Sequence, residues 1–250
     1  MTPAIFKKYE RTAVVGDGRS VFDFLGGAIL AEYKAGWTPL AEGKELTPGY
    51  PGANEWYIDW IACLVSAYLA KDAFRVVELG AGYAQWMVSS VQAFKALNPD
   101  GKAYGLALEA DEVHYGWMLD HVKANFDAFT GVDTDLLHSA AGRDGTVSFP
   151  VLAEPSRNYG ASVSKGAAVS SGHDYVTVPS ESLRSIYARL GENLVDILHI
   201  DIQGAEVDLL LEADVTPELH CTKALMIGTI VPTMFISKCG IWWLHRVSKS

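Results

Sequence analysis

The stretch Phe74-Arg-Val-Val-Glu-Leu-Gly-Ala-Gly82 decides the fold, because it joins an apolar run directly to a turn with two glycines. An amphipathic stretch at residues 83–97 follows at once, so the order is strand, glycine turn, helix. Glycines at the carboxyl end of a buried parallel strand let a ligand approach the backbone closely, and the N–H groups of the next helix point into the same crevice. We expect a small polar ligand to bind at this turn.

From this turn outward, the chain alternates between strands and helices. Apolar runs predict strands at 75–79, 103–109, 135–140, 195–201 and 223–229. Helical spacing of apolar residues predicts helices at 55–69, 83–97, 112–126, 181–190 and 205–212. Strands separated by helices of this length form a parallel sheet covered on both faces. The predicted fold class is therefore α/β, with a doubly wound and mostly parallel sheet.

Two regions depart from this alternation. Residues 1–52 mix glycine, proline and charge, which predicts an N-terminal extension of irregular or partly helical structure before a domain at 53–250. Between Thr146 and Val178 the sequence becomes rich in Ser, Gly and Ala, which predicts a long loop. So long a loop in a compact domain is more often functional than idle.

Composition limits the partners that we expect. The 250 residues include 20 Lys and Arg against 30 Asp and Glu, so the formal charge of −10 argues against nucleic acid or an anionic membrane. The three cysteines lie far apart and form no CxxC pair, which indicates neither a disulfide framework nor a zinc site. The N-terminus lacks an apolar signal segment, and the uncharged stretch 224–237 is too short to span a bilayer. We expect a cytoplasmic protein.

Three acidic residues, Glu78, Glu109 and Asp201, stand at the carboxyl ends of the first, second and fourth predicted strands. In an open α/β sheet these ends face one crevice. Each acid alone fits a solvated loop position, but acids at the ends of three strands of one sheet indicate a shared site. Glu109 stands where a carboxylate can accept hydrogen bonds from both ribose hydroxyls of a nucleoside.

The glycine turn separates two classes of nucleoside cofactor. A nicotinamide dinucleotide fingerprint needs a third glycine at the position of Gln85, which counts against NAD. Glu78 would repel a pyrophosphate, whereas it can hold a cationic ammonium group. S-adenosylmethionine carries an α-amino group and a sulfonium and no phosphate, so it is the favoured ligand.

The sequence resembles the class I S-adenosylmethionine-dependent methyltransferases and, within them, the FkbM type. The resemblance covers roughly residues 53–230, and its most specific element is Asp201-Ile-Gln-Gly-Ala-Glu206. Other matching stretches are 55–60, 76–82, 108–110, 139–142, 158–162, 195–200 and 227–229. This resemblance implies a Rossmann-like sheet closed at one edge by two antiparallel strands.

The resemblance also implies which residues bind the cofactor. They stand at or near strand ends: Glu78, Gly80, Gly82, Glu109, Ala110, Ser139, Ala140 and Asp201. The first three would line the methionine portion, Glu109 would bind the ribose, and the next three would lie against the adenine. Asp201 would lie near the methionine and sulfonium end.

The implied reaction is O-methylation, because members of the family use hydroxyls of small molecules or saccharides as acceptors. The protein must align the acceptor oxygen, the methyl group and the sulfur, and exclude water. A base would add about 10²–10⁴-fold, and Asp201 and Glu206 are the candidates, with His173 a third. Glu206 fits a helix-dipole role equally well, and His199, on an apolar strand, is expected to be a core residue.

The acceptor is expected to contact residues of one helix and of the long loop: Tyr57, Asn158, Tyr159, Ser162 and His173. Trp56 and Trp60 share the helix with Tyr57 and could cover the cofactor, although aromatic residues at helical spacing more often belong to a core. No metal site is assigned, since Asp201 with Gln203 or Glu206 lacks the dense carboxylate set that a site made of protein ligands alone requires.

The C-terminal part departs from the family pattern. After residues 227–229 only 241–244 is a strand candidate, so we expect at most one closing strand and an atypical, truncated edge. A second copy of the chain could shield such an edge, which makes a homo-oligomer possible. Two functions stay open: an O-methyltransferase, and an S-adenosylmethionine-binding scaffold without turnover. A third function, an NAD-dependent oxidoreductase, predicts binding of a nicotinamide cofactor, and Gln85 at the third glycine position argues against it.

Overall fold

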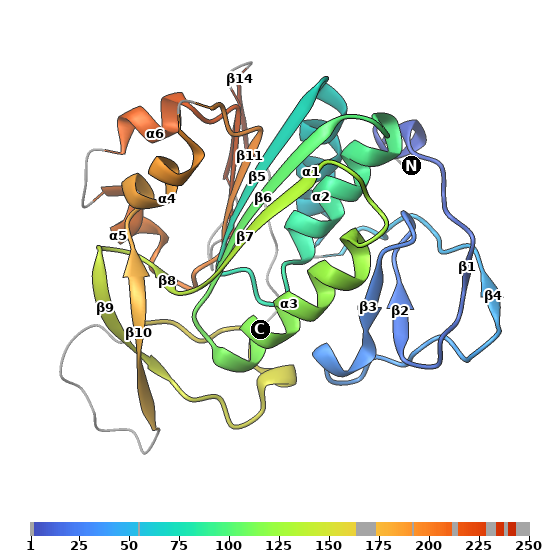
Figure 1. The fold of residues 1–250 in the computed structure, drawn as a ribbon, viewed down its shortest axis with the longest axis horizontal. Coiled ribbons are helices and arrows are strands. Elements are labelled where there is room, and N and C mark those ends of the chain that lie inside the picture. The colour runs from blue at the N-terminus through green and yellow to red at the C-terminus, as the bar shows by residue number, and fades with distance from the viewer. Residues whose placement is uncertain are drawn as a thin grey trace.

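The computed structural model describes residues 3–54, 56–163, 174–191, 193–211, 215–228, 234–237 and 240–243. A seven-stranded sheet in the order β14-β13-β12-β11-β5-β6-β7 forms the centre of the molecule (Figure 1). Its strands are β5 (Ala73–Leu79), β6 (Lys102–Glu109), β7 (Val132–His138), β11 (Ile197–Ile200), β12 (Ala224–Ile227), β13 (Met234–Ser237) and β14 (Gly240–Trp243). The strands from β12 to β7 run parallel. The predicted doubly wound α/β fold is confirmed.

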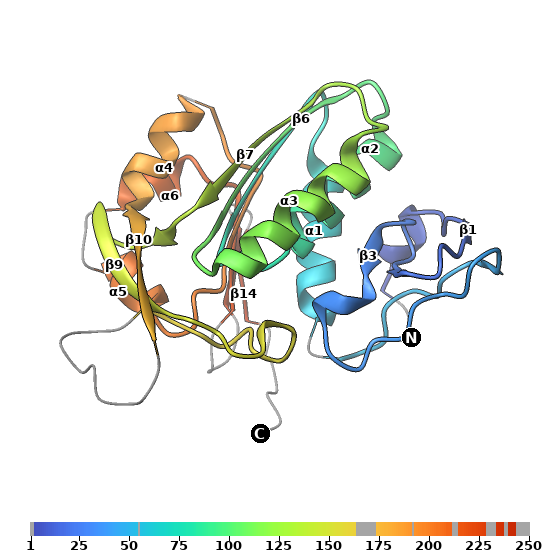
Figure 2. The same cartoon turned by 60° about the horizontal axis from the view of Figure 1, so that its bottom comes forward.

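Helices cover both faces of this sheet, as Figures 1 and 2 show. On one face lie α1 (Tyr57–Leu69), α2 (Gln85–Leu97) and α3 (Glu112–Phe126), and on the other lie α4 (Leu183–Leu190), α5 (Glu206–Leu211) and α6 (Thr216–His220). Successive strand residues point to opposite faces, so Val76 packs in the core under α1–α3 and Val77 in the core under α4–α6. Glu78 therefore points to the same face as Val76.

The prediction for the closing edge of the sheet is wrong in the number of strands. The sequence predicted at most one strand there, at 241–244, whereas β13 and β14 are both present and antiparallel to their neighbours. Each strand has four residues, which is too short for a clear alternation of apolar and polar residues.

Among the described helices, none combines the length and apolar character needed to cross a bilayer.

A second, three-stranded sheet replaces much of the predicted long loop. It contains β8 (Ala140–Ala141), β9 (Gly145–Pro150) and β10 (Tyr175–Glu181), and β9 pairs antiparallel with β10. The prediction of a loop from Thr146 to Val178 is thus wrong at both ends. The sequence did not reveal these two strands because the residues that pair with each other lie far apart in it. Residues 151–163 remain a connection with one 3-10 turn, η3 (Pro155–Arg157).

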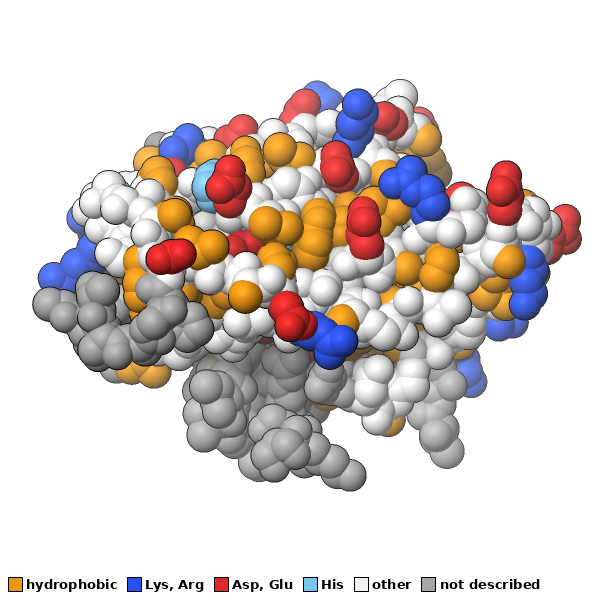
Figure 3. Space-filling model, turned by 90° about the horizontal axis from the view of Figure 1, so that it is seen from below, with side chains coloured by type: hydrophobic (Ala, Val, Ile, Leu, Met, Phe, Trp, Pro, Cys, Tyr) orange, Lys and Arg blue, Asp and Glu red, His pale blue; other side chains and the backbone are white. Residues whose placement is uncertain are grey.

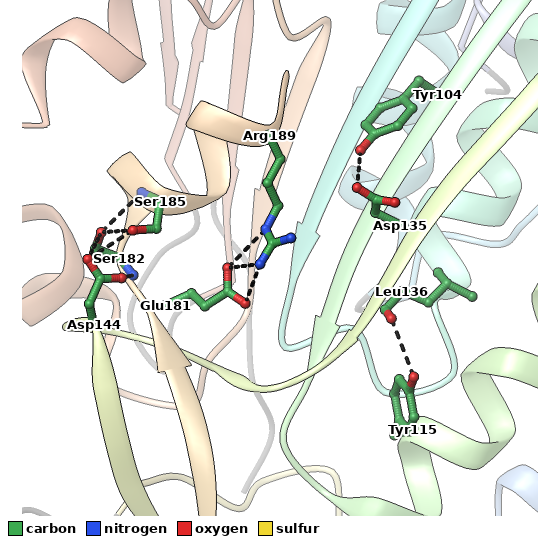
Figure 4. A network of polar contacts seen from close by, with 9 residues as sticks. All are labelled: Tyr104, Tyr115, Asp135, Leu136, Asp144, Glu181, Ser182, Ser185 and Arg189. Atoms are coloured by element: carbon green, nitrogen blue, oxygen red, sulfur yellow. Dashed lines mark hydrogen bonds and ion pairs between the residues drawn. The ribbon is translucent and has the colours of Figure 1, made fainter. Parts of the chain in front are cut away.

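Polar contacts tie this second sheet to α4 (Figure 4). The Asp144 carboxylate, in the turn before β9, accepts hydrogen bonds from the Ser182 amide at 2.7 Å and from the Ser182 and Ser185 hydroxyls, both at 2.9 Å. Ser182 also caps α4, since its Oγ accepts a hydrogen bond from the Ser185 amide at 3.1 Å. The start of α4 is therefore fixed by the turn between β8 and β9.

Replacing Ser182 by Ala is expected to lower the free energy of unfolding by about 1 kcal/mol, the usual value of an N-cap side chain. Urea denaturation measures this change. Ser148→Ala, at an exposed position in β9, is the control and should change stability by less than about 0.5 kcal/mol. Equal losses in the two variants would show that the cap does not stabilise α4.

The described part of the N-terminal segment is mostly irregular, as expected, but it also contains short paired strands that were not predicted. β1 (Val14–Val15) pairs with β4 (Glu45–Leu46), and β2 (Ser20–Phe22) pairs with β3 (Ala28–Leu30). Two 3-10 turns, η1 (Phe6–Lys8) and η2 (Ala31–Tyr33), complete the segment.

Specific contacts hold this segment on the helices α1 and α3. The Phe24 ring packs 5.2 Å from the ring of Trp60 in α1. The Asn125 side chain of α3 accepts a hydrogen bond from the Ala28 N–H and donates one to the Ala28 carbonyl, both at 2.9 Å. The segment is thus part of the packed structure, and it borders the edge of the sheet where the strands β5–β7 end (Figure 1).

Candidate functional site

A cavity of about 290 Å³ lies at the carboxyl ends of β5, β6 and β11, near the lower end of the range of about 300–1,000 Å³ that ligand pockets span. The strand order reverses here, because β5 has β6 on one side and β11 on the other, and ligands of open α/β sheets bind at such a point. Figure 3 shows this edge from below: hydrophobic and acidic side chains share the middle of the face, and most basic side chains lie toward its rim.

The glycine turn after β5 forms the floor of the cavity. Gly80 and Gly82 have φ of 73° and 56°, a backbone region that favours glycine. A Cβ atom at Gly80 would collide with the carbonyl oxygen of Asp201, and one at Gly82 would lie 3.2 Å from the Tyr159 ring. The Gly80 N–H also donates to the Leu108 carbonyl at 3.0 Å. The turn therefore needs glycine both for its backbone angles and for the close approach of β11.

Glu109, the last residue of β6, holds this turn from the other side. Its carboxylate accepts hydrogen bonds from the Gly82 amide at 2.7 Å and from the Asp111 amide at 2.8 Å. Each carboxylate oxygen keeps a second lone pair, and Glu109 lines the cavity. Burial raises the pKa of Glu109 to about 7.

Glu78 lies one residue before the end of β5 and stabilises the start of α2. Its carboxylate accepts hydrogen bonds from the Met87 amide at 2.7 Å and from the Trp86 amide at 3.3 Å. These N–H groups belong to the first turn of α2, where intrahelical partners are missing. Glu78 also lines the cavity, and burial raises its pKa to about 7. The same carboxylate thus caps a helix and faces the ligand space.

One half of the cavity, beside β6 and β7, is largely apolar. Ala110, Ala140 and Phe149 line it and belong to one buried cluster. The Ser139 hydroxyl is buried in this wall, and no described residue lies within hydrogen-bond distance of it. An apolar wall with a buried, unpaired hydroxyl fits an aromatic ring that carries polar atoms at its edge.

The other half, beside β11, is polar and aromatic. The Asp201 carboxylate accepts a hydrogen bond from the Gln203 side chain at 2.8 Å. Trp56 lines this half. The ammonium group of Lys34, from the N-terminal segment, lies 3.9 Å from the centre of the Trp56 ring. Among the described residues, no three His, Cys, Asp or Glu side chains are grouped as a metal site would require.

The structure brings together all eight residues that were predicted to bind the cofactor. Each of them lines the cavity: Glu78, Gly80, Gly82, Glu109, Ala110, Ser139, Ala140 and Asp201. Three of the residues predicted to contact the acceptor, Asn158, Tyr159 and Ser162, line it as well. Their contacts with a ligand stay predictions.

Two other predicted site residues, Tyr57 and Glu206, do not line the cavity. The Tyr57 ring stacks on Phe6, with 5.6 Å between ring centres, and its neighbour Trp56 lines the cavity instead. The Glu206 carboxylate accepts hydrogen bonds from the amides of Ile202 at 3.0 Å and Gly204 at 2.9 Å, so it closes its own turn. His173 lies outside the described residues.

Several cavity residues were not predicted as site residues: Lys34, Tyr83, Trp86, His114, Phe149 and His199. His114 stacks on Tyr159 with 4.4 Å between ring centres, and its Nε2 lies 3.0 Å from the Pro155 carbonyl oxygen. The Tyr159 hydroxyl in turn donates to the Tyr33 carbonyl. Closeness to a predicted site residue in the sequence could have indicated three of these unpredicted residues, since Tyr83 and Trp86 follow Gly82 and His199 stands two residues before Asp201.

Comparisons with known proteins agree with this geometry. Residues 80–222, more than half of the chain, match the family model described as "Methyltransferase FkbM domain". A protein of Jannaschia sp. (strain CCS1), described as a "Putative methyltransferase", is 25% identical over 239 residues, which cover 89% of this chain and 80% of that protein.

Two solved structures were also matched. One, from Plasmodium falciparum, is assigned as a protein-L-isoaspartate O-methyltransferase in complex with S-adenosyl-L-homocysteine; it has a TM-score of 0.38 and 12% identity, and the match covers 87% of this chain and 83% of that one. The other is the methyltransferase FkbM of Methylobacillus flagellatus KT, with a TM-score of 0.39, 14% identity, and coverage of 64% of this chain and 34% of that one. On the match to the family model, the chain belongs to the FkbM methyltransferase family.

Proposed function

We propose that this methyltransferase uses S-adenosylmethionine and methylates a hydroxyl group of a small molecule or saccharide. The observation that carries the proposal is that Glu78, Glu109 and Asp201, from three adjacent strands, line one cavity. Three carboxylates favour a cationic ligand and disfavour a phosphate. S-adenosylmethionine has two cationic groups and an adenosine, and it has no phosphate.

The cavity residues fit the parts of this cofactor. Glu109 would accept hydrogen bonds from the ribose hydroxyls through its free lone pairs. The unpaired Ser139 hydroxyl would bond the polar edge of the adenine, which the apolar wall of Ala110 and Ala140 would hold flat. Glu78 would attract the ammonium group, and the methionine chain would lie against the glycine turn, since Gly80 and Gly82 both line the cavity.

When bound, S-adenosylmethionine supplies a methyl group that is already activated by the sulfonium. The protein's part is to align the acceptor and exclude water. Asp201, held by Gln203, would lie beside the sulfonium. Trp56 and Trp86 would cover the reacting atoms, and Lys34, Asn158 and Ser162 would contact the rest of the acceptor.

Calorimetric titration with S-adenosylhomocysteine, followed by transfer of labelled methyl groups from S-adenosylmethionine to a panel of hydroxyl compounds and saccharides, tests this function. Binding together with transfer supports it. Binding without transfer to any member of the panel would favour the scaffold. Absence of binding, or preferential binding of NAD, would overturn the cofactor assignment.

The affinity for S-adenosylhomocysteine is expected to fall about 10-fold between pH 8 and pH 6, because the pKa of Glu78 is about 7 and only its ionised form attracts the ammonium. In the ligand-free protein the sign is reversed: a raised pKa gives stability at low pH that is lost as the pH rises through 7. Titrations at both pH values measure the change. Glu78→Gln should reduce the pH dependence to the part that Glu109 contributes, because the pKa of Glu109 is also about 7. An equal affinity of the original protein at both pH values would contradict the role of Glu78.

A further inference from the structure

A buried acid–histidine pair lies beside the polar half of the cavity. Asp59 of α1 and His199 of β11 are both 2% exposed, and the Asp59 Oδ1 atom lies 3.3 Å from the His199 Nε2 atom. The two residues are 140 positions apart in the sequence, so only the packing of α1 on the sheet brings them together. His199 also lines the cavity.

The neighbours of this pair place it among groups of the site. His199 lies directly opposite Glu78 in the ladder between β11 and β5, so both side chains point to the face that α1 and α2 cover. The His199 ring centre lies 6.0 Å from that of Trp86, which lines the same cavity. Asp201 follows two residues later at the end of the strand.

Both side chains carry an atom without a partner. The His199 Nδ1 and the Asp59 Oδ2 are buried, and neither has a hydrogen-bond partner among the described residues. Apart from Glu78, the strand residues next to the pair on this face are apolar: Val76, Ile197 and Met226. Burying polar atoms without partners costs free energy, so a pair serving only to fill the core would be better replaced by apolar side chains.

We propose that Asp59 and His199 form an acid–base pair in which His199 accepts the proton that the acceptor hydroxyl loses during methyl transfer. The inference rests on the proposed function of the cavity. Asp59 would accept a hydrogen bond from the Nε2–H of neutral His199, and this bond fixes the tautomer whose Nδ1 carries the free lone pair. Nδ1 is covered in the ligand-free structure, so a small shift of the cavity side chains on binding would bring it within reach of the acceptor hydroxyl, directly or through one water.

The step balances as an in-line displacement. The acceptor oxygen forms a bond to the methyl carbon, and the carbon–sulfur bond breaks with its electron pair going to sulfur. The hydroxyl proton moves to Nδ1 of His199, and the resulting imidazolium lies against the Asp59 carboxylate. Release of this proton to solvent restores the neutral base before the next turnover.

The charges around His199 explain how it becomes a base. Burial by itself lowers the pKa of His199, but the hydrogen bond to Asp59 and the charges of Glu78, Asp59 and Asp201 outweigh burial and raise it. The other neighbours, Trp86 of α2 and Met226 of β12, are uncharged. A cationic ligand that binds the same carboxylates opposes a charge on His199, so cofactor binding would expel its proton.

This coupling can be measured without any acceptor. S-adenosylmethionine carries the sulfonium and S-adenosylhomocysteine does not, so the first should release more protons on binding. Titration calorimetry near pH 7 in two buffers of different ionisation enthalpy counts these protons. His199→Gln should remove the difference between the two ligands. His121→Gln, which changes a buried histidine of α3 outside the cavity lining, should retain it.

The base role is tested with an acceptor found in the panel, at saturating S-adenosylmethionine. His199→Gln should lower kcat about 10²–10⁴-fold and abolish the decline of kcat at low pH, while the affinity for S-adenosylhomocysteine changes only a few-fold. Asp59→Asn removes the charge that raises the pKa of His199, so it should move this decline to lower pH. Asp59→Asn retains the shape of the buried side chain and serves if His199→Gln does not fold.

The outcomes separate this inference from the proposed function. If the original protein fails to bind S-adenosylhomocysteine, the proposed function is wrong. If it binds both ligands with equal proton release, or if His199→Gln keeps kcat and its pH profile, the acid–base pair is overturned while the cofactor assignment stands. A kcat that falls with an unchanged pH profile in Asp59→Asn would give Asp59 a purely structural role and also overturn the pair.

Discussion

Replacing Glu109 by Gln is expected to weaken binding of S-adenosylhomocysteine by about 1.5–3 kcal/mol, or about 10- to 150-fold. The ribose hydroxyls would lose a charged acceptor, and the amide side chain offers only one acceptor oxygen. Gln keeps the shape of Glu and can still accept the hydrogen bond from the Gly82 amide. Calorimetric titration of the variant measures the loss.

The neighbouring residue Glu112 provides the matched control for this variant. It lies in the first turn of α3 and its side chain is exposed. Glu112→Gln should leave the affinity unchanged, and thermal unfolding of both variants shows whether the fold is retained. An affinity of Glu109→Gln equal to that of Glu112→Gln would contradict the assignment of the ribose to Glu109.

Replacing Gly80 by Ala is expected to lower the free energy of unfolding by about 2–5 kcal/mol. Holding a residue with a Cβ atom in left-handed backbone geometry costs about 1–2 kcal/mol, and Gly80 has a φ of 73°. The new Cβ would also collide with the Asp201 carbonyl oxygen, and overpacking adds about 1–3 kcal/mol. Urea denaturation measures the sum.

Gly43 separates these two contributions. Its φ of 72° nearly equals that of Gly80, but a Cβ atom there would have nothing within 4 Å. Gly43→Ala should therefore show only the backbone cost of about 1–2 kcal/mol. If both variants lose the same stability, the close approach between the ends of β5 and β11 is not what requires glycine at position 80.

The parallel part of the sheet could be predicted from the sequence because its strands are buried on both faces. Such strands appear as short apolar runs, as in Val195-Asp-Ile-Leu-His-Ile200, and a glycine turn marks the end of β5. One rule then brings the acids together: carboxyl ends of parallel strands meet at one edge. For this reason Glu78, Glu109 and Asp201 could be assigned to one cavity without any knowledge of the packing.

Other cavity residues depend on packing that the sequence does not reveal. Tyr57 was predicted to face the acceptor, but successive residues of a helix differ by about 100° in direction, and Trp56 lines the cavity instead. Lys34 reaches the site only because the whole N-terminal segment docks on α1 and α3. His199 was predicted as a core residue, and its partner Asp59 could not be identified from the sequence.

In the proposed function, the residues that would bind the donor and those that would contact the acceptor come from different parts of the fold. The contacts assigned to the nucleoside come from strand ends of the central sheet, whereas Lys34 comes from the N-terminal segment, whose short strands pair only among themselves. Insertions or exchanges in that segment would alter which molecule is methylated and leave the donor half intact. A new specificity for the methyl acceptor can thus arise from changes in the N-terminal segment alone. Mutant libraries that seek such a specificity should vary residues 31–37.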